Sequence, residues 1–253
     1  MKKLEVSIID YKMSNLHSVE AACVAVGLNA VITSNPKDIL ESNATILPGV
    51  GGFGGAMSNI RKLGLDSTIK DFVSSGKPLF GVCLGLQLLF DSSEEFGSHQ
   101  GLGLLKGSAS KFKLSSTDGD KYPVPQIGWN KIYPGKQKWN STFMEDCSEG
   151  DYMYFVHSYY IEPEDKNIIL SNTIYGDLEY CSSVNEGNVF ATQFHPELVG
   201  DENRRRFLQY FDHYIKTIGK EESENKVKRR RSVRNVISRS NHGKSAKENV
   251  IIN

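Results

Sequence analysis

The residue best suited to covalent chemistry in this sequence is Cys83, which stands between two glycines in the segment GVCLG at 81–85. An apolar run over Pro78–Val82 precedes it and a helical pattern over Leu84–Phe90 follows it, so the thiol is predicted at a strand-to-helix junction. Glycines at such a sharp turn leave space around an exposed nucleophile, and the N-terminus of the following helix favours the thiolate. A buried core cysteine is the alternative interpretation, and the flanking glycines favour the nucleophile.

A partner for the thiol is present in the segment ATQFHPE at 191–197, where His195 and Glu197 are two residues apart after a predicted strand. In an extended chain such residues project to the same side, so Glu197 is expected to hold one imidazole tautomer of His195. Alone, this segment would more simply be a surface histidine beside a turn proline. Together with Cys83 it predicts a Cys-His-Glu triad.

A thiolate that attacks an amide carbonyl builds negative charge on oxygen, and backbone N–H groups must stabilise that charge. The Leu84 N–H is one predicted donor, because it directly follows the nucleophile. The loop Pro48–Gly51 could turn a second N–H, that of Val50 or Gly51, toward the same place. A plain glycine-rich turn is the alternative. The loop lacks the spacing of a Walker phosphate loop and its Lys-Ser/Thr pair, so nucleotide binding there is not expected.

Alternating strands and helices must position these residues in the first half of the chain. Apolar and β-branched runs predict strands over Val6–Ile9, Ala30–Thr33, Ala44–Leu47 and Pro78–Val82. Apolar residues at helical spacing predict helices over Asn15–Val26, Met57–Ser75 and Leu84–Phe90. This order is typical of an α/β fold with a mostly parallel central sheet and helices on both faces.

The pattern changes from about Leu104 onward to short alternating segments separated by Gly, Pro, Asn and Asp. These segments predict an added antiparallel region, with strands over Ser108–Leu114, Trp129–Tyr133, Tyr152–Tyr159, Ile168–Thr173, Glu179–Val184 and Val189–Phe194. A final helix is predicted over Glu202–Ile215, with its apolar side chains toward the body of the domain.

The chain of 253 residues with 39% hydrophobic composition suits one large α/β domain, predicted over residues 1–217. Residues 218–253 contain ten Lys or Arg against four Glu and predict a basic, disordered tail, with binding of an anionic partner or nucleic acid as the less favoured alternative. No run approaches the roughly 18 apolar residues needed to cross a bilayer, so a soluble, cytoplasmic protein is expected. The four cysteines form no CxxC pair and suggest neither a disulfide framework nor a zinc site.

Three segments resemble the class I (triad) glutamine amidotransferases, in which a cysteine attacks the side-chain amide of glutamine and releases ammonia: PGVGGFGGAM at 48–57, GVCLGLQLLF at 81–90 and ATQFHPE at 191–197. Within that family the sequence is similar to the glutaminase subunits of imidazole glycerol phosphate synthase, which serve histidine biosynthesis. The segments that carry this similarity are IIDYKMSNLHSVEAA at 8–22, IGWNKI at 127–132 and YFVHSYY at 154–160. The resemblance covers roughly residues 4–215 and implies a flavodoxin-like fold.

The resemblance implies that Cys83 is the nucleophile, that His195 is the general base and acid, and that Glu197 orients the imidazole. It also implies that L-glutamine is held near four further positions, Gly51, Gln87, Ser158 and Tyr159. We expect no cofactor and no metal ion, since the histidines do not group with cysteines or carboxylates at ligand spacing.

The resemblance further implies a heterodimer, in which the glutaminase docks on the mouth of a (β/α)8 barrel cyclase and passes ammonia into it. Asn15, Trp129 and Asn130 match positions expected near that interface, and ordinary strand core is the alternative interpretation of Trp129 and of Tyr154–Tyr160. Little activity is expected until the partner's ligand binds, with the oxyanion loop turned away in the free subunit. The segment Leu198–Gly200 departs from the Lys-Ser pair usual in this subfamily, so docking here is expected to use other contacts.

Three alternatives stay open. The same glutaminase chemistry could serve a paralogous enzyme that aminates a sugar for surface polysaccharides, which the departure at Leu198–Gly200 motivates. The chain could be an inactive regulatory module, against which the intact Cys83, His195 and Glu197 argue. A stand-alone cysteine protease or hydrolase is the third, and the subfamily segments outside the triad argue against it.

Overall fold

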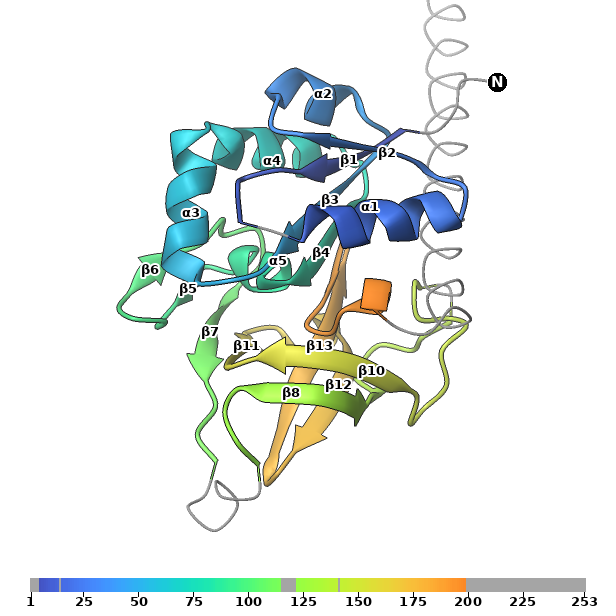
Figure 1. Cartoon of the computed structure of the whole chain (residues 1–253). Coiled ribbons are helices and arrows are strands. Elements are labelled where there is room, and N and C mark those ends of the chain that lie inside the picture. Colours follow the sequence, from blue (N-terminus) through green and yellow to red (C-terminus); the bar gives the residue numbers. More distant parts are fainter. Residues whose placement is uncertain (1–4, 14, 115–121, 141, 199–253) are drawn as a thin grey trace, which may run out of the picture. The chain divides into compact units, whose positions relative to one another are not determined.

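Strands and helices alternate in the first half of the chain, as the hydrophobic pattern predicts (Figure 1). The structure is a computed structural model, and it describes residues 5–13, 15–114, 122–140 and 142–198. The elements of this half are β1 (Glu5–Ile9), α1 (Leu16–Ala25), β2 (Asn29–Thr33), α2 (Pro36–Glu41), β3 (Ala44–Gly49), α3 (Phe53–Lys62), α4 (Leu65–Ser74), β4 (Leu79–Cys83) and α5 (Leu84–Leu88). The predicted helix over 202–215 and the predicted tail over 218–253 lie outside the described residues.

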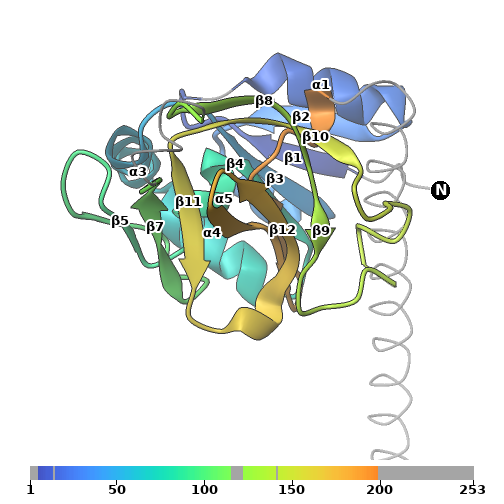
Figure 2. The ribbon, with the colours of Figure 1, turned by 90° about the horizontal axis from the view of Figure 1, so that it is seen from below.

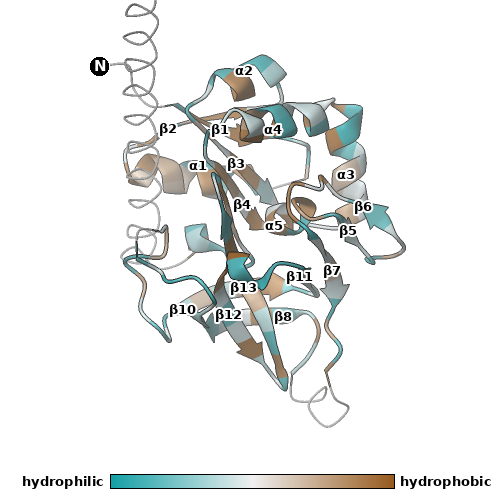
Figure 3. Cartoon of the chain, turned by 180° about the vertical axis from the view of Figure 1, so that it is seen from behind, coloured by the Kyte–Doolittle hydropathy of each residue, from teal (hydrophilic) through white to brown (hydrophobic). Residues whose placement is uncertain are grey.

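Five parallel strands form the centre of the sheet, in the order β2, β1, β3, β4 and β14 (Val189–Thr192). Every residue of β3, β4 and β14 is buried, so both faces of the sheet are covered. Figure 2 shows α1 on one side of these strands and α4 and α5 on the other, and Figure 3 shows hydrophobic residues along β1 and β3. The predicted α/β fold is confirmed, and the carboxyl ends of its parallel strands share one edge.

The second half of the chain extends this sheet with mostly antiparallel strands. After β14 the order continues through β13 (Leu178–Glu186), β11 (Tyr159–Pro163), β7 (Gly107–Lys111), β5 (Ser92–Ser93) and β6 (His99–Gln100), while β12 (Ile169–Tyr175) pairs with β13 and with β9 (Tyr133–Pro134). The strands β8 (Gln126–Lys131) and β10 (Tyr152–His157) form a separate antiparallel pair. Two 3-10 helices, η1 (Lys166–Ile168) and η2 (Pro196–Leu198), belong to this half. No helix in the described ranges is long and apolar enough to cross a membrane.

An aromatic stack fastens β4 to β14. The rings of Phe80 on β4 and Phe190 on β14 stack with centroids 4.9 Å apart, and Phe143 stacks on Phe190 at 4.7 Å. All three side chains are buried. Because these two strands end at Cys83 and just before His195, the stack holds the backbone that carries both residues in a constant relation.

Some predicted elements are wrong in extent, and two of them bear on the site. The helix predicted over Met57–Ser75 is two helices, because Gly64 adopts a left-handed φ of 67° and interrupts the helical path between α3 and α4. The strand predicted over Tyr152–Tyr159 breaks at Ser158, since β10 pairs with β8 whereas β11 pairs with β7 and β13. That break is a bend in the backbone at the carboxyl edge of the sheet.

Candidate active site

Cys83 ends β4 and directly precedes α5, as the sequence predicts. Its φ of 54° and ψ of −109° form a conformation that residues with side chains rarely adopt. The neighbouring glycines make this turn possible. A Cβ on Gly85 would collide with the Leu47 carbonyl oxygen. A Cβ on Gly81 would lie 2.9 Å from that of Ala191. The segment therefore forms a strained elbow that presents the thiol at the edge of the sheet.

His195 and Glu197 lie together, and both side chains are buried. The Nδ1 atom of His195 is 2.8 Å from Oε1 of Glu197, so the carboxylate accepts the Nδ1 proton and leaves Nε2 as the basic atom. The reason for this proximity differs from the prediction, because Glu197 lies in the 3-10 turn η2 and not in an extended strand. The His195 N–H donates to the Tyr154 carbonyl oxygen at 2.9 Å, which fixes the start of the turn.

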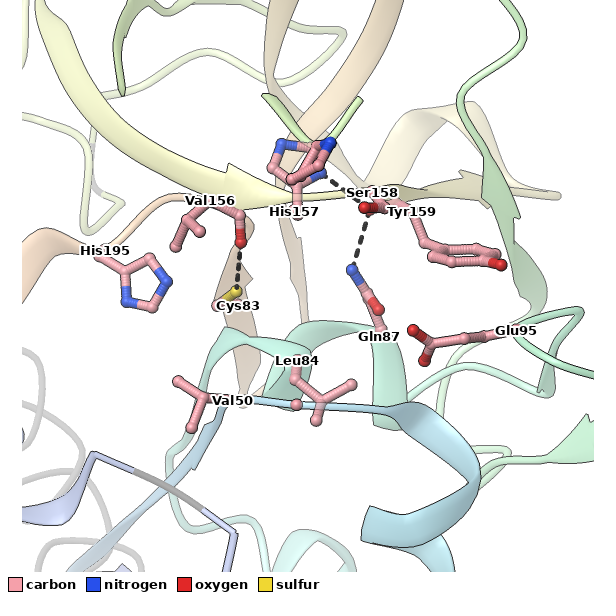
Figure 4. A pocket seen from close by; sticks show the side chains of 12 residues that line it. Val50, Cys83, Leu84, Gln87, Glu95, Val156, His157, Ser158, Tyr159 and His195 are labelled. Carbon is pink, nitrogen blue, oxygen red and sulfur yellow. Dashed lines mark hydrogen bonds between the residues drawn. The ribbon is translucent and has the colours of Figure 1, made fainter. Parts of the chain in front are cut away.

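The imidazole ring of His195 lies beside Cys83 (Figure 4). Its Nε2 has no hydrogen-bond partner among the described residues, and catalytic hydrogen bonds are often loose before substrate binds. Burial lowers the pKa of His195, but attraction to the Cys83 thiolate and to Glu197 outweighs burial and raises the pKa to about 10. The imidazolium form is therefore favoured whenever the thiolate is present.

The glycine-rich loop after β3 lies next to Cys83, because Gly49 and Cys83 are register partners at the ends of β3 and β4. The Val50 N–H donates to the Met13 carbonyl oxygen at 3.3 Å, so it is not available to an oxyanion in this arrangement. The Leu84 N–H is the first of α5, and the first N–H groups of a helix have no acceptor within it. The Leu84 N–H therefore remains a predicted oxyanion donor at the start of α5, whereas the Val50 N–H is bonded to Met13.

A cavity of about 260 Å³ opens over Cys83 (Figure 4). Its wall includes all of the side chains or backbone expected to meet glutamine or the oxyanion, namely Val50, Gly51, Leu84, Gln87, Ser158 and Tyr159, together with His195. These residues come from the loop after β3, from the elbow at α5 and from the bend between β10 and β11. Within the described ranges, no group of His, Cys, Asp and Glu side chains is arranged to hold a metal ion.

The family model for class I glutamine amidotransferases matches residues 7–214 of this chain. The chain belongs to that family. A curated relative from Aquifex aeolicus, described as imidazole glycerol phosphate synthase subunit HisH, is 46% identical over 191 residues, which is 75% of this chain and 87% of the relative. A relative from Sulfurimonas denitrificans with the same description is 42% identical over 209 residues, which is 83% of this chain and 98% of the relative. The predicted family is confirmed.

Solved amidotransferase structures share the fold. The chain of PurLQS from Thermotoga maritima superposes with a TM-score of 0.61 at 22% identity, covering 84% of this chain and 99% of that one. A structure described as a glutamine amidotransferase superposes with a TM-score of 0.60 at 19% identity, covering 81% of this chain and 97% of that one. At such identities the likeness shows the fold alone, and that fold is the predicted one.

The amidotransferase cavity also contains a carboxylate that the sequence did not single out. Glu95 follows β5 and lies beside Gln87 and Tyr159 (Figure 4). Its Oε2 accepts a hydrogen bond from the Phe53 N–H at 2.5 Å, which fixes the carboxylate against the start of α3. In the sequence the run Ser-Ser-Glu-Glu looks like an ordinary polar turn. Only the pairing of β5 with β7 brings Glu95 to the cavity.

A second histidine, His157, lines the amidotransferase cavity from the end of β10. Its Nδ1 lies 2.8 Å from the Tyr159 carbonyl oxygen and its Nε2 lies 3.2 Å from the Tyr180 hydroxyl. Burial lowers the pKa of His157 to about 4, against the opposing hydrogen bond to Tyr159. This histidine is therefore neutral, and the carbonyl oxygen at Nδ1 shows that Nδ1 carries the proton.

One face of β8 and β10 is exposed and largely apolar. It consists of three cross-strand pairs, which we call the outward face: Ile127 with Val156, Trp129 with Tyr154, and Lys131 with Tyr152. Trp129 is 52% exposed, and its ring centroid lies 5.7 Å from that of Tyr154. Val156 belongs both to this face and to the cavity wall. The outward face therefore adjoins the entrance to the candidate active site.

The other two residues predicted near a partner are placed differently. Asn130 lies on the opposite side of β8 from Trp129, and its Nδ2 donates to the Ile174 carbonyl oxygen at 2.9 Å. The alternation of a strand explains this, since neighbouring residues point to opposite faces. Asn15 is the exposed N-cap residue of α1, two positions after Met13, whose carbonyl oxygen holds the Val50 N–H.

Proposed function

We propose that this chain is the glutaminase subunit of an imidazole glycerol phosphate synthase of histidine biosynthesis. It hydrolyses L-glutamine to glutamate and ammonia, and a (β/α)8 barrel cyclase subunit uses the ammonia to make imidazole glycerol phosphate and an aminoimidazole carboxamide ribotide. The observation that carries the proposal is the meeting of Cys83 and a Glu197-bound His195 at one cavity. The relatives described as HisH subunits support the pathway.

The chemistry follows from the atoms at the cavity. Nε2 of His195 takes the proton of the Cys83 thiol, and the thiolate attacks the side-chain carbonyl carbon of glutamine. The oxygen of the tetrahedral intermediate carries a negative charge that the Leu84 N–H stabilises. When the intermediate collapses, the imidazolium returns its proton to the departing nitrogen, and ammonia leaves. Water then attacks the remaining thioester with His195 as the base, and glutamate is released with the thiol restored.

Recognition of the amino-acid end of glutamine is assigned to the far side of the cavity from His195. The Glu95 carboxylate is suited to pair with the α-ammonium group, because the opposite charges attract in a partly enclosed site. Gln87 is anchored by its Nε2, which donates to the Tyr159 carbonyl oxygen at 2.9 Å. Ser158 and Tyr159 complete this side through the bend between β10 and β11.

Activity in the free subunit is limited by the second oxyanion donor. The Val50 N–H must leave the Met13 carbonyl oxygen before it can meet an oxyanion, and that requires rotation of the peptide in the Gly49–Gly51 loop. The left-handed φ of 99° at Gly51 makes such a rotation accessible, since glycine adopts both signs of φ. A partner that contacts the loop before Asn15 would displace Met13 and free the donor.

The outward face of β8 and β10 is the surface assigned to the cyclase. It is exposed, it contains the aromatic pair Trp129 and Tyr154, and it meets the cavity wall at Val156. Exposed aromatic residues at the centre of an apolar patch are typical of binding hot spots. Ammonia released at Cys83 would then emerge directly against the partner. Leu198, which stands where the subfamily has lysine, is 38% exposed and adds an apolar contact in place of a charge.

A cytoplasmic location belongs to the same proposal. Cys83 has to be a thiol to act, and it is unpaired in the structure. The cytoplasm keeps thiols reduced, which suits a catalytic cysteine. The alternative acceptor, a sugar in surface-polysaccharide synthesis, rests on the segment Leu198–Gly200, of which only Leu198 is among the described residues.

The decisive experiment measures glutamate release from glutamine by the wild type and by Cys83→Ala. Each protein is assayed alone and with the barrel cyclase subunit plus its nucleotide ligand. We expect activity that depends on the partner and is lost in Cys83→Ala, while Cys147→Ser, a half-buried cysteine away from the cavity, keeps it. Activity without coupling to this cyclase would point to the polysaccharide pathway, and no activity in any mixture would point to an inactive module.

A further inference from the structure

Gln193, two residues before His195, is fully buried and uses both ends of its amide within the site. Its Nε2 donates toward the Cys83 Sγ at 3.6 Å, which is a normal length for a hydrogen bond to sulfur. Its Oε1 accepts from the Nε2 of Gln87 at 3.0 Å. The Gln193 backbone N–H donates to the Ser182 carbonyl oxygen at 2.9 Å, so the residue is anchored to β13 as well. Gln193 therefore contacts Cys83 through a hydrogen bond as well as filling space in the core.

The direction of this amide is imposed by a backbone carbonyl. The Tyr159 carbonyl oxygen can only accept, and it faces Gln87, so Gln87 must present its NH₂ group there. The same NH₂ group also faces Gln193, so Gln193 must present its oxygen to Gln87. The NH₂ group of Gln193 is then the end that faces Cys83. The chain of hydrogen bonds from the Tyr159 carbonyl therefore ends in an N–H donor at the sulfur.

An N–H donor at Sγ stabilises the thiolate form of Cys83 more than the thiol form. The thiol can donate its own proton to the Val156 carbonyl oxygen, 3.8 Å from Sγ, and needs no donor. The thiolate can only accept, and Gln193 directs an N–H donor at Sγ in addition to the protonated His195. We propose that Gln193 stabilises the Cys83 thiolate through this N–H···S bond, in addition to the charge of His195.

The proposal rests on the glutaminase activity proposed above, because a stabilised thiolate matters only if Cys83 is the nucleophile. The proton lost from Sγ goes to Nε2 of His195, so the step creates a thiolate and an imidazolium with no net change in charge. Other ionisable groups lie near the thiolate whether or not Gln193 is present. Glu95 after β5, His157 on β10 and Tyr159 on β11 line the cavity, the buried Tyr11 after β1 interacts electrostatically with Cys83, and Glu197 lies behind His195.

The test is the pH dependence of Cys83 alkylation by iodoacetamide in the intact protein, followed by mass spectrometry of the Cys83 peptide. The thiolate reacts and the thiol does not, so the midpoint of the rate profile reports thiolate formation. In Gln193→Leu we expect the midpoint to rise by about one pH unit, because a hydrogen bond to a charged group is worth about one pKa unit or more. In Gln193→Glu, which keeps the volume and places a negative group at the sulfur, we expect a larger rise.

Thr192→Val is the matched control. Thr192 is also fully buried at the end of β14, but its hydroxyl donates to the Phe194 carbonyl oxygen and not to the sulfur. In Thr192→Val the midpoint of the Cys83 alkylation profile should equal that of the wild type. Unchanged midpoints in both Gln193 variants, or an equal shift in Thr192→Val, would overturn the proposal. If Gln193→Leu fails to fold, Gln193→Glu decides. Alkylation needs neither glutamine nor cyclase, so this result stands apart from the test of the pathway.

Discussion

The parallel and antiparallel halves of this amidotransferase each place a buried histidine at the cavity, and they give it opposite properties. His195, after the parallel strand β14, lies against Glu197 and Cys83, and its pKa is raised to about 10. His157, at the end of the antiparallel strand β10, meets a carbonyl oxygen and the Tyr180 hydroxyl, and burial lowers its pKa to about 4. Burial acts on both rings, so the partners decide the charge: a carboxylate and a thiolate on one side, and neutral groups on the other.

The two halves also differ in how much of their backbone is enclosed. β4, which ends at Cys83, and β14, which precedes His195, are buried on both faces, and this restrains the backbone that positions the two residues. In β10 buried residues alternate with more exposed ones, and in β8 half-buried residues alternate with exposed ones after Gln126, so one face remains available to another molecule. Cys83 and His195 therefore lie where the backbone is most constrained, whereas the outward face lies where one side of the strands is open.

The largest effect is expected from Gly85→Ala in the elbow of the parallel half. The new Cβ would overlap the Leu47 carbonyl oxygen, and neither backbone can move without disturbing β3 and α5. We expect a loss of about 4 kcal/mol in the free energy of unfolding, measured by urea denaturation, together with loss of glutaminase activity.

Gly150→Ala is the matched change in the antiparallel half. Gly150 has a left-handed φ of 87°, but a Cβ there would meet no atom within 4 Å. The loss should be only about 1–2 kcal/mol, the conformational cost of a side chain in that region. Equal losses of unfolding free energy in Gly85→Ala and Gly150→Ala would show that the close packing around Gly85 does not make the elbow more sensitive than the antiparallel half.

A second prediction concerns His157 and acid. Its pKa is near 6.5 in the unfolded chain and about 4 in the folded protein, so the unfolded state binds more protons between these values. The stability that a neutral His157 confers is therefore complete above pH 6.5 and is lost as pH falls toward 4, by roughly 3 kcal/mol. In His157→Asn the free energy of unfolding should change less steeply with pH between pH 6.5 and pH 4. The free energy of unfolding of both proteins, measured from pH 4 to pH 8, gives the two slopes.

Above pH 7 the two curves should be parallel, because His157 is neutral in both states there. His157→Asn will be the less stable protein at that pH, since the bond to the Tyr180 hydroxyl is lost. Slopes that coincide between pH 6.5 and pH 4 would mean that His157 takes up its proton in the folded state as easily as in the unfolded one.

Local sequence was enough to predict the strand-to-helix junction at Cys83, because Gly81, Cys83 and Gly85 are neighbours in the chain. The proximity of His195 and Glu197 was also predicted, but for the wrong local reason, since a 3-10 turn and not an extended strand joins them. The break at Gly64 was not predicted, because the apolar residues before and after this glycine continue a similar helical spacing.

The residues that the sequence did not reveal are those that reach the site through pairing between distant segments. Glu95 depends on β5 beside β7, and His157 on the bend that separates β10 from β11. Gln193 lies in the same segment as His195, but its role depends on Gln87, 106 residues away. Polar side chains in short loops carry no periodic signal, so only the tertiary fold shows where they point.

The smallest effect is expected on the outward face, and on binding alone. Trp129→Ala removes an exposed aromatic side chain beside Tyr154, so the free energy of unfolding should change little. If this face meets the cyclase, calorimetric titration of the cyclase should give a Kd about 30-fold higher, which corresponds to about 2 kcal/mol for a central aromatic contact.

Trp139→Ala is the matched change at a buried position. The Trp139 Nε1 donates to the Leu170 carbonyl oxygen at 2.7 Å and only 8% of the side chain is exposed, so its loss should cost about 3–5 kcal/mol of folding free energy. The two tryptophans should therefore separate stability from binding. An unchanged Kd for Trp129→Ala would place the docking surface elsewhere. A large loss of folding free energy in Trp129→Ala would mean that Trp129 stabilises the fold, and the outward face would then not be assigned to binding.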